Sequence, residues 1–349
     1  MMIPYPGIIG LLIHKTKTTD VIQPYSVLIP IHNKMHELKL TLDAVYAQSV
    51  MPEAVVVVDD KSTDGSLSFL KSLNYPNITI IELEKNVGKA NAINIALESI
   101  DTPIVFIVDA DTMLAPTYCA KVLTGFVDDV VGCSGRVLAL KHDTAAQKSR
   151  TVEYLYSQRM AKMAQVKLGG VWVGAGCGCA YNVAWLKSVG GMPTRSLVED
   201  LELSWIAQRD HSLNYIHDAI MYTVDPEGVV EYIKQCYRWF SWRSSINRVG
   251  FSTMKRGLKC IIGYSLLEIG FAIAFLAVVA GSLATGNYLY LLCALLSDWL
   301  IYMIVGGYEG YKAGELANVV ESVPYTIVFR YLNLVILLYA LVRPKKLWY

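Results

Sequence analysis

The sequence predicts an α/β domain, a mixed but mostly parallel sheet flanked by helices, followed by C-terminal transmembrane and interfacial helices. Two observations indicate this architecture. From Tyr25 to about Asp225, short β-branched apolar runs alternate with helical stretches, the pattern of strands joined by helical crossovers. Most charged residues lie before Lys259 and the apolar excess lies after it, so the two parts of the chain face different surroundings.

The composition favours a membrane protein over a soluble or a nucleic-acid-binding one. Charged residues make up 17% of the 349 residues, whereas they are about 25% of typical soluble domains. The formal net charge is +1 and no basic block occurs, so no nucleic-acid partner is expected. The cysteines are scattered, with Cys177 and Cys179 as the one close pair. They predict small buried thiols and neither a disulfide framework nor a zinc site.

Four short apolar runs predict buried strands, because each is rich in β-branched residues and is bounded by turn residues. The predicted strands are Val27–Ile31, Ala54–Val58, Ile78–Ile81 and Ile104–Val108. Helical stretches, such as Lys34–Gln48 and Lys89–Ser99, separate them. In sheets of this kind ligands bind beyond the carboxyl ends of the strands, and the polar motifs of this sequence stand at those ends.

We expect three segments along the chain. Residues 1–20 form an apolar segment at the membrane interface, residues 21–255 a cytosolic α/β domain, and residues 256–349 transmembrane and interfacial helices. Met1–Ile13 is mostly apolar, but it is shorter than the roughly 20 residues that a span needs. It also lacks the positively charged start of a signal peptide, so an interfacial anchor is the expected role.

Two apolar stretches are long enough to cross a bilayer. Ile261–Leu283 and Tyr288–Val305 each contain one charged residue, and the connector between them contains none. Lys255, Arg256 and Lys259 precede the first stretch, and such basic residues stay on the cytosolic side. We therefore predict a multi-pass protein of the plasma or inner membrane whose N-terminal domain is cytosolic.

A third apolar stretch, Tyr325–Val342, ends in basic residues that would lie outside if it spanned. An interfacial helix keeps those residues inside and is the preferred interpretation, with a span as the alternative. The acids of the two predicted spans are Glu268 and Asp298. Acidic residues within a bilayer usually face an aqueous path or a charged partner, and Arg330 is a candidate partner. The alternative is that they lie near the end of a span, where the carboxylate reaches the membrane surface.

Two motifs follow the first two predicted strands. The first strand is expected to break at Pro30, and Asn33 then caps the following helix or takes part in ligand binding. Asp59 and Asp60 follow the second strand directly. Keeping two acids beside a buried strand is costly, so they are candidates for hydrogen bonds to a nucleobase or a ribose. Helix capping by neighbouring residues is the structural alternative.

Two further motifs point to a phosphate and a metal. Residues 86–94 open a helix with glycine and small residues beside Lys89. The N-terminus of such a helix attracts phosphate, and the lysine adds a positive charge. The alternative is a helix start without a binding role. Asp109 and Asp111 follow the fourth strand as D-x-D, so both carboxylates point to one side of the extended chain. Oxygen ligands of this type suit Mg²⁺ or Mn²⁺ together with substrate phosphates.

Two motifs near the end of the domain complete the candidate site. Asp200 opens an amphipathic helix, where an acid either serves the helix dipole or acts as a general base in a cleft. Gln235, Arg238 and Trp239 fall on one face of a later helix at i, i+3 and i+4. That face combines an amide, a guanidinium and a flat ring, although a helix at a membrane surface uses the same residue types.

The order of these motifs resembles glycosyltransferase family 2, in particular its membrane-embedded processive branch, which includes cellulose, chitin, hyaluronan and poly-N-acetylglucosamine synthases. The resemblance covers roughly Tyr25–Phe251 and the general layout of the C-terminal tail. It implies a GT-A fold and an inverting, metal-assisted transfer of a sugar to the growing end of a polysaccharide. The implied donor is a UDP-sugar such as UDP-N-acetylglucosamine.

The resemblance also implies a role for each candidate residue. Asp111 would ligate Mg²⁺ or Mn²⁺, and Asp200 would be the base. The loop Gly174–Ala180 would lie on the acceptor side, unless its glycines only allow close backbone packing. The remaining candidates would contact the nucleotide, the diphosphate or the acceptor end, and they are Pro30, Asn33, Asp59, Asp60, Lys89, Asp109, Gln235, Arg238 and Trp239.

Other functions stay open at this point. Two predicted spans are few for a channel that secretes a polysaccharide. Self-association or a partner protein would then complete the channel. Alternatively, the enzyme adds only one or a few sugars. A non-processive transferase with a lipid-linked or short glycan acceptor is one alternative. A catalytically silent membrane scaffold that binds a sugar nucleotide is another, although the acids at 109, 111 and 200 argue against it. The expected partners are a nucleotide-sugar donor, a glycan acceptor and the lipid bilayer.

Overall fold

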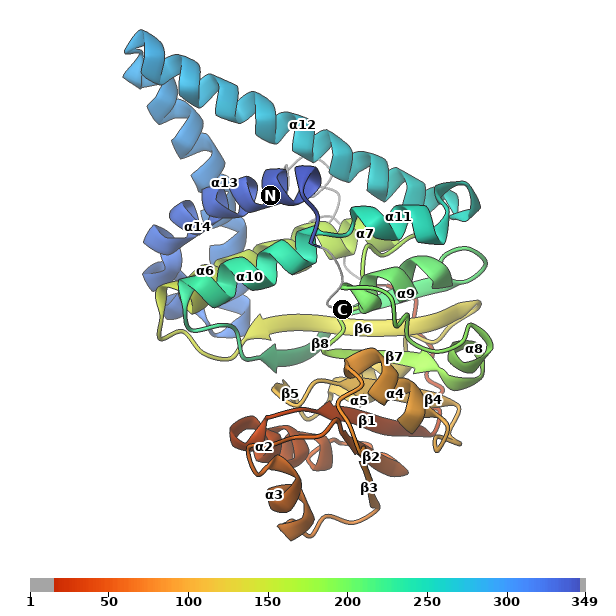
Figure 1. Cartoon of the computed structure of the whole chain (residues 1–349). Coiled ribbons are helices and arrows are strands. Elements are labelled where there is room, and N and C mark those ends of the chain that lie inside the picture. Colours follow the sequence, from red (N-terminus) through yellow and green to blue (C-terminus); the bar gives the residue numbers. More distant parts are fainter. Residues whose placement is uncertain (1–15, 346–349) are drawn as a thin grey trace.

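A mixed eight-stranded sheet lies at the centre of the protein, with helices on both of its faces and three long helices after it (Figure 1). The computed structural model describes residues 16–345. The predicted interfacial segment Met1–Ile13 lies outside the described residues, and the side chains of Glu268 and Asp298 are not among those described. The roles predicted for them therefore stay predictions.

The sheet combines parallel and antiparallel pairs in the order β3-β2-β1-β4-β7-β6-β8-β5. Pairs β1–β2, β1–β4, β2–β3 and β6–β8 are parallel, and the other three are antiparallel. The mixed, mostly parallel sheet predicted from the sequence is therefore confirmed. The strands are β1 (Tyr25–Ile31), β2 (Ala54–Asp59), β3 (Ile78–Glu82), β4 (Ile104–Val108), β5 (Thr112–Leu114), β6 (Val130–Ala139), β7 (Gly178–Asn182) and β8 (Ser212–Thr223).

The prediction that the first strand breaks at Pro30 is wrong. Strand β1 continues through Pro30 to Ile31. Proline has no N–H group and is normally excluded from central strands. Here the pairing of β1 with β4 ends at Leu28, while Pro30 pairs with Val58 of β2. Pro30 therefore lies where β1 is paired with β2 alone. The strand can accommodate a residue without an N–H group at this position.

Two hydrophobic cores lie on opposite faces of the sheet. Residues of β1 alternate between them, since Val27 and Ile29 pack in one core and Leu28 packs in the other. Helices α2, α3 and α5 cover the first core, and α4, α8 and α9 cover the second. The helices of this part of the chain are α2 (Met35–Tyr46), α3 (Ser66–Ser72), α4 (Lys89–Leu97), α5 (Tyr118–Leu123), α6 (Ala145–Ser157), the π-helical turn Gln158–Lys162, α7 (Met163–Lys167), α8 (Val183–Ser188), α9 (Glu199–Ala207), α10 (Val229–Phe240), α11 (Arg243–Val249) and the short 3₁₀ turn Phe251–Thr253.

Three long helices follow, α12 (Arg256–Thr285), α13 (Tyr288–Ala313) and α14 (Leu316–Val342). Helices α12 and α13 form a hairpin that projects away from the sheet (Figure 1). Large apolar side chains on this hairpin are exposed, for example Leu267 at 62% and Leu289 at 70%. Exposed apolar area on this scale calls for a covering surface, because single soluble domains rarely display it.

Helices are present at both predicted spans, Ile261–Leu283 and Tyr288–Val305. Within residues 16–345, however, none of the single helices has the length and hydropathy expected of a membrane span. The helical pieces 316–326 and 328–342, which meet at a bend of 56°, reach that standard when taken together. Neither of the two predicted spans therefore meets this standard, and the pair that does includes the stretch Tyr325–Val342, for which a span was the alternative interpretation.

Helix α13 extends beyond the predicted end at Val305 and packs against the α/β domain. Val305 is buried among residues of β6, α6 and the turn that follows α6. Glu309 is also buried, and its carboxylate lies 3.1 Å from Arg136, 3.4 Å from Arg159 and 3.2 Å from His217. This charged cluster ties the end of the hairpin to the sheet.

Helix α14 packs along α6 and α10. The ring of Phe329 meets Tyr232 of α10 edge to face at 4.9 Å, and the Tyr232 hydroxyl donates a hydrogen bond to Asn333 Oδ1 at 3.0 Å. The stretch Tyr325–Val342, predicted as an interfacial helix, is thus the second part of α14. Its position at a membrane surface stays a prediction.

Candidate active site

One cavity of about 510 Å³ lies beyond the carboxyl ends of β4 and β8, where helices α9, α10, α12 and α14 meet. The motifs predicted to form one site converge on it. Of the predicted site residues, those that line the cavity are Lys89, Asp109, Asp111, Asp200, Gln235, Arg238 and Trp239. The structure thus brings together the candidate metal ligand, the candidate base and the candidate contacts for phosphate and acceptor.

Asp109 and Asp111 lie at the acidic end of the cavity, each paired with a lysine. Lys89 Nζ is 2.6 Å from Asp109 Oδ1 and 3.8 Å from Glu199 Oε1, and Lys34 Nζ is 2.7 Å from Asp111 Oδ2. Burial raises the pKa of Asp109, although Lys89 opposes it. Burial alone would lower the pKa of Lys89, but the nearby carboxylates outweigh it and raise that pKa. Lys89 therefore stays charged where a phosphate could meet it.

Asp200 stands in the first turn of α9 and faces a glycine loop. Its Oδ1 accepts a hydrogen bond from the N–H of Leu201 at 2.8 Å. Gly176 lies against the other oxygen, since a Cβ added at Gly176 would be 2.6 Å from Asp200 Oδ2. A side chain at position 176 would push the carboxylate aside, so the loop predicted on the acceptor side confines the candidate base.

Asp59 and Asp60, predicted to contact a nucleobase or ribose, are not among the residues that line the cavity. Both are buried. The Asp60 carboxylate accepts hydrogen bonds from the N–H groups of Val87 at 2.7 Å and Gly88 at 2.8 Å. Asp60 therefore shapes the turn that begins α4 and presents Lys89 to the cavity. A direct contact with the nucleotide stays a prediction for both acids.

Pro30 and Asn33 are likewise absent from the cavity lining. Pro30 is buried within β1. Asn33 does not cap α2, whose first residues receive no capping hydrogen bond from its side chain. It adopts a positive φ of 55°, and its Oδ1 accepts a hydrogen bond from the N–H of Thr63 at 2.8 Å. Asn33 thus joins the two loops that follow β1 and β2.

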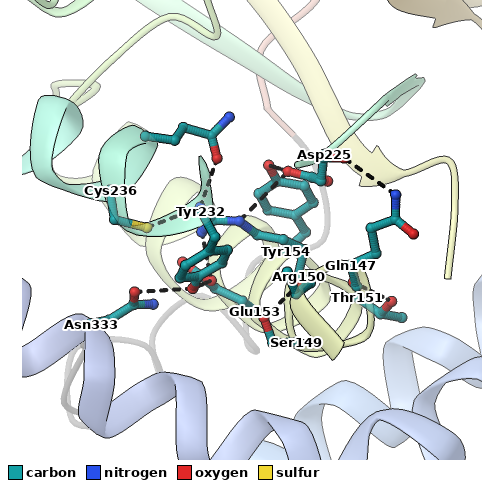
Figure 2. Close-up of polar contacts among 12 residues, drawn as sticks. Gln147, Ser149, Arg150, Thr151, Glu153, Tyr154, Asp225, Tyr232, Cys236 and Asn333 are labelled. Atoms are coloured by element: carbon teal, nitrogen blue, oxygen red, sulfur yellow. Dashed lines mark hydrogen bonds and ion pairs between the residues drawn. The ribbon is translucent and has the colours of Figure 1, made fainter. Parts of the chain in front are cut away.

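Helix α10 presents Gln235, Arg238 and Trp239 to the cavity, as the helical spacing predicted. Behind them lies Arg150 of α6, a fully buried side chain that no sequence motif singles out. Figure 2 shows Arg150 between Asp225, at the end of β8, and the α10 residues Tyr232 and Cys236. The site is therefore backed by a buried polar layer.

Sequence reasoning missed Glu199, Lys162 and Asp225, which also line the cavity. Glu199 directly precedes Asp200 in the E-D motif, and Asp225 follows β8. Their positions at a helix start and a strand end were signals of the type used for the other acids. Lys162 lies in the π-helical turn after α6. Such turns often mark functional sites, but a helical sequence does not reveal them.

Lys162 is a buried cation in the cavity wall whose Nζ donates a hydrogen bond to the carbonyl oxygen of Val173. Burial lowers the pKa of Lys162 from 10.5 to about 8. Between pH 8 and pH 10.5 the lysine is therefore protonated in the unfolded chain but mostly neutral in the folded one. Below about pH 8 it is charged in both states, and burial of the charge lowers the stability of the folded protein. This penalty is relieved as the pH rises toward 10.5.

Replacing Lys162 by Met is expected to raise the free energy of unfolding at pH 7 by at most about 3 kcal/mol, at about 1.36 kcal/mol per pKa unit, because the loss of the hydrogen bond to the Val173 carbonyl offsets part of the gain. The advantage of the variant should shrink as the pH rises through 8, because wild-type Lys162 then loses its charge. Urea unfolding of both proteins at pH 7 and pH 10 measures the two differences. Equal differences at the two pH values would contradict the assignment.

Residues 26–190 match the family model of Glycosyl transferase family 2. This stretch of the chain therefore forms a family 2 glycosyltransferase domain. The poly-beta-1,6-N-acetyl-D-glucosamine synthase of Staphylococcus aureus strain COL is 25% identical over 244 residues, which cover 68% of this chain and 58% of the synthase. The synthase of the same name from Staphylococcus epidermidis is 24% identical over 225 residues, covering 62% of this chain and 54% of the synthase. The chain thus spans less than two thirds of the length of these relatives.

Among solved structures, the mannosyltransferase PcManGT from Pyrobaculum calidifontis, in complex with GDP-Man and Mn²⁺, matches this chain with a TM-score of 0.61. The match covers 88% of this chain and 93% of the other at 21% sequence identity. It shows a shared fold, the GT-A-like mixed sheet with flanking helices. The family and fold expected from the motifs are therefore confirmed.

Proposed function

We propose that the chain is a membrane-bound glycosyltransferase that transfers a sugar with inversion from a UDP-sugar, such as UDP-N-acetylglucosamine, to the growing end of a polysaccharide. The observation that carries this proposal is the single cavity shared by Asp111, Asp200 and the α10 face of Gln235, Arg238 and Trp239. The similarity to poly-beta-1,6-N-acetyl-D-glucosamine synthases supports a polysaccharide product. The intact acids argue against a silent scaffold.

The residues at the acidic end of the cavity fit a divalent cation. Within the described part of the chain, no group of three or more His, Cys, Asp or Glu side chains is arranged to hold a metal. Mg²⁺ and Mn²⁺ commonly take one or two carboxylates and complete their coordination with substrate phosphates and water. Asp111 would hold the ion and Asp109 the ribose. When bound, the ion would neutralise charge on the leaving diphosphate.

Asp200 would act as the general base at the other side of the donor sugar. The acceptor hydroxyl gives its proton to the Asp200 carboxylate and bonds to the anomeric carbon, while the bond from that carbon to the nucleoside diphosphate breaks. Lys89 and Arg238 supply positive charge for the diphosphate as it leaves. Trp239 would orient the acceptor ring by stacking, which contributes geometry to the reaction.

Attachment to a bilayer is supported by the hairpin of α12 and α13. Its exposed apolar side chains include Leu283, Leu292 and Leu300, each more than half exposed. The basic residues Lys255 and Arg256 stand where α12 begins, beside the α/β domain. A bilayer around the distal hairpin would cover the apolar surface and leave the cavity on the cytosolic side.

A lipid-linked acceptor is a second candidate, favoured by the large apolar side chains of the cavity lining. These include Trp172 and Trp242, Ile269 of α12 and Leu337 of α14. The same space therefore contacts the catalytic acids and two of the C-terminal helices. An acceptor with an apolar portion beside its reacting hydroxyl or phosphate would bury that portion here.

The purified protein, incubated with Mn²⁺ and a panel of nucleotide sugars, tests the proposal through release of nucleoside diphosphate. Release with one UDP-sugar and loss of release on chelation are expected. No release with any donor, with or without membrane lipid, would refute the proposed activity. With the active donor, long polymers after extended incubation favour the polysaccharide acceptor. Labelled product that partitions into organic solvent favours the lipid-linked one.

A further inference from the structure

Arg150 is a buried cation behind the cavity whose role the proposed chemistry does not yet explain. Its side chain has no exposed surface. Nη1 lies 2.8 Å from Glu153 Oε2, and Nε lies 3.6 Å from Asp225 Oδ1 (Figure 2). A guanidinium leaves water only where charged and hydrogen-bonding groups replace it. The two carboxylates account for its charge, and its remaining contacts all point to helix α10 or to Tyr154.

The same guanidinium also contacts helix α10 through Nη2. Nη2 donates hydrogen bonds to Gln235 Oε1 at 3.0 Å and to Cys236 Sγ at 3.1 Å. The guanidinium carbon lies 4.2 Å from the ring centre of Tyr232 and 4.7 Å from that of Trp239. A guanidinium placed over aromatic rings gains from the interaction with each of them. Arg150 thus contacts two of the residues that α10 presents to the cavity, Gln235 and Trp239.

The contact with Gln235 decides which way its amide points. Arginine has donors and no acceptor, so the amide oxygen must face Arg150. The amide nitrogen, with its two N–H groups, is then the part that Gln235 can offer to a ligand in the cavity. A substrate diphosphate or sugar hydroxyl accepts hydrogen bonds from such a group. Trp239 is fixed in the same way, because the guanidinium covers its ring.

We infer that Arg150 is a positioning residue that sets the amide of Gln235 and the ring of Trp239 in the orientation that sugar transfer uses. Asp225 and Glu153 hold Arg150 in turn, so the end of β8 and helix α6 determine the geometry of α10. This inference rests on the proposed function, since it takes Gln235 and Trp239 as contacts of the diphosphate and the acceptor.

The test is Arg150→Lys, which keeps the charge near the two carboxylates but loses the planar fork. With the donor identified above, kcat should fall about 10- to 100-fold while KM for the donor changes less than about threefold. The matched control is Arg159→Lys, a buried arginine in the following turn that pairs with Glu309 at 3.4 Å and does not line the cavity. It should lose thermal stability to a similar degree but keep its kcat.

A double variant separates positioning from a general structural role. If Arg150 acts through Gln235 as well as through Trp239, Arg150→Lys combined with Gln235→Ala should lower kcat by less than the product of the two single losses, because the part that acts through Gln235 is already gone. Wild-type kcat in Arg150→Lys, an equal loss in Arg159→Lys, or losses that multiply in the double variant would each overturn the inference. An inactive wild type would instead refute the proposed function.

Gln235→Glu provides a second route if Arg150→Lys does not fold. A glutamate keeps an oxygen for Arg150 and adds an ion pair, but it has no N–H group for the cavity. We expect a melting temperature at or above that of the wild type and a kcat lowered at least about 10-fold. Full activity of this variant would show that the amide N–H groups are not used, and the inference would fail.

Discussion

Replacing Asp200 by Asn is expected to abolish sugar transfer while nucleotide binding survives. Asparagine has the same shape, so it fits beside Gly176 and can still accept the hydrogen bond from the Leu201 N–H. Its amide, however, cannot take the proton of the acceptor hydroxyl. General-base groups contribute about 10²- to 10⁴-fold to a rate, and we expect a loss of this size in nucleoside diphosphate release.

Asp210→Asn is the matched control, because Asp210 is an exposed acid just after the end of the same helix, α9. It should turn over at the wild-type rate. Calorimetric titration with the nucleoside diphosphate would measure binding in both variants. Turnover of Asp200→Asn equal to that of the wild type would remove Asp200 from the role of base.

The second large effect is expected for Asp111→Asn. The substitution removes the carboxylate charge at the acidic end of the cavity and leaves Lys34, now 2.7 Å from Asp111 Oδ2, without its ion-pair partner. A bound metal contributes several kcal/mol to the stabilisation of developing charge, so turnover should fall by about 100-fold or more. Added Mn²⁺ should restore little of it. Rates measured across a Mn²⁺ titration give both the affinity and the maximum.

Asp101→Asn, at an exposed acid before β4, serves as the control and should leave the Mn²⁺ titration unchanged. If Asp111→Asn instead shows the wild-type Mn²⁺ dependence, the metal is held elsewhere. In that case the pairing of Lys34 with Asp111 would be a structural ion pair of the acidic end, and the role of Asp109 would have to be tested in the same way.

The strands and the main acids could be predicted because their signals are local. Val27–Ile31 and Ile104–Val108 are continuous apolar runs, and such runs form buried strands in the middle of a sheet. The D-x-D acids follow one of these strands directly, so the sheet itself carries Asp109 and Asp111 to the edge where ligands bind. The i, i+4 spacing likewise places Gln235 and Trp239 on one face of α10.

The roles of several other residues could not be predicted, because they depend on contacts between distant segments. Asp60 looked like a nucleotide contact, yet its carboxylate holds the N–H groups of Val87 and Gly88. Nothing near Arg150 in the sequence distinguishes it from a surface arginine of an amphipathic helix. Its burial follows from the packing of α6 against α10 and α14, which no local pattern specifies.

The amino-acid sequence by itself determined the α/β sheet, the helical C-terminal third and the residue types of the site, because hydrophobic periodicity and strand-end motifs act over a few residues. The tertiary structure decided how these parts serve one another. It placed Ile269 and Leu337 of the C-terminal helices in the cavity of the D-x-D acids, and it set Arg150 behind Gln235. The physical reason is that burial and charge pairing at these positions arise only when segments far apart in the chain pack together.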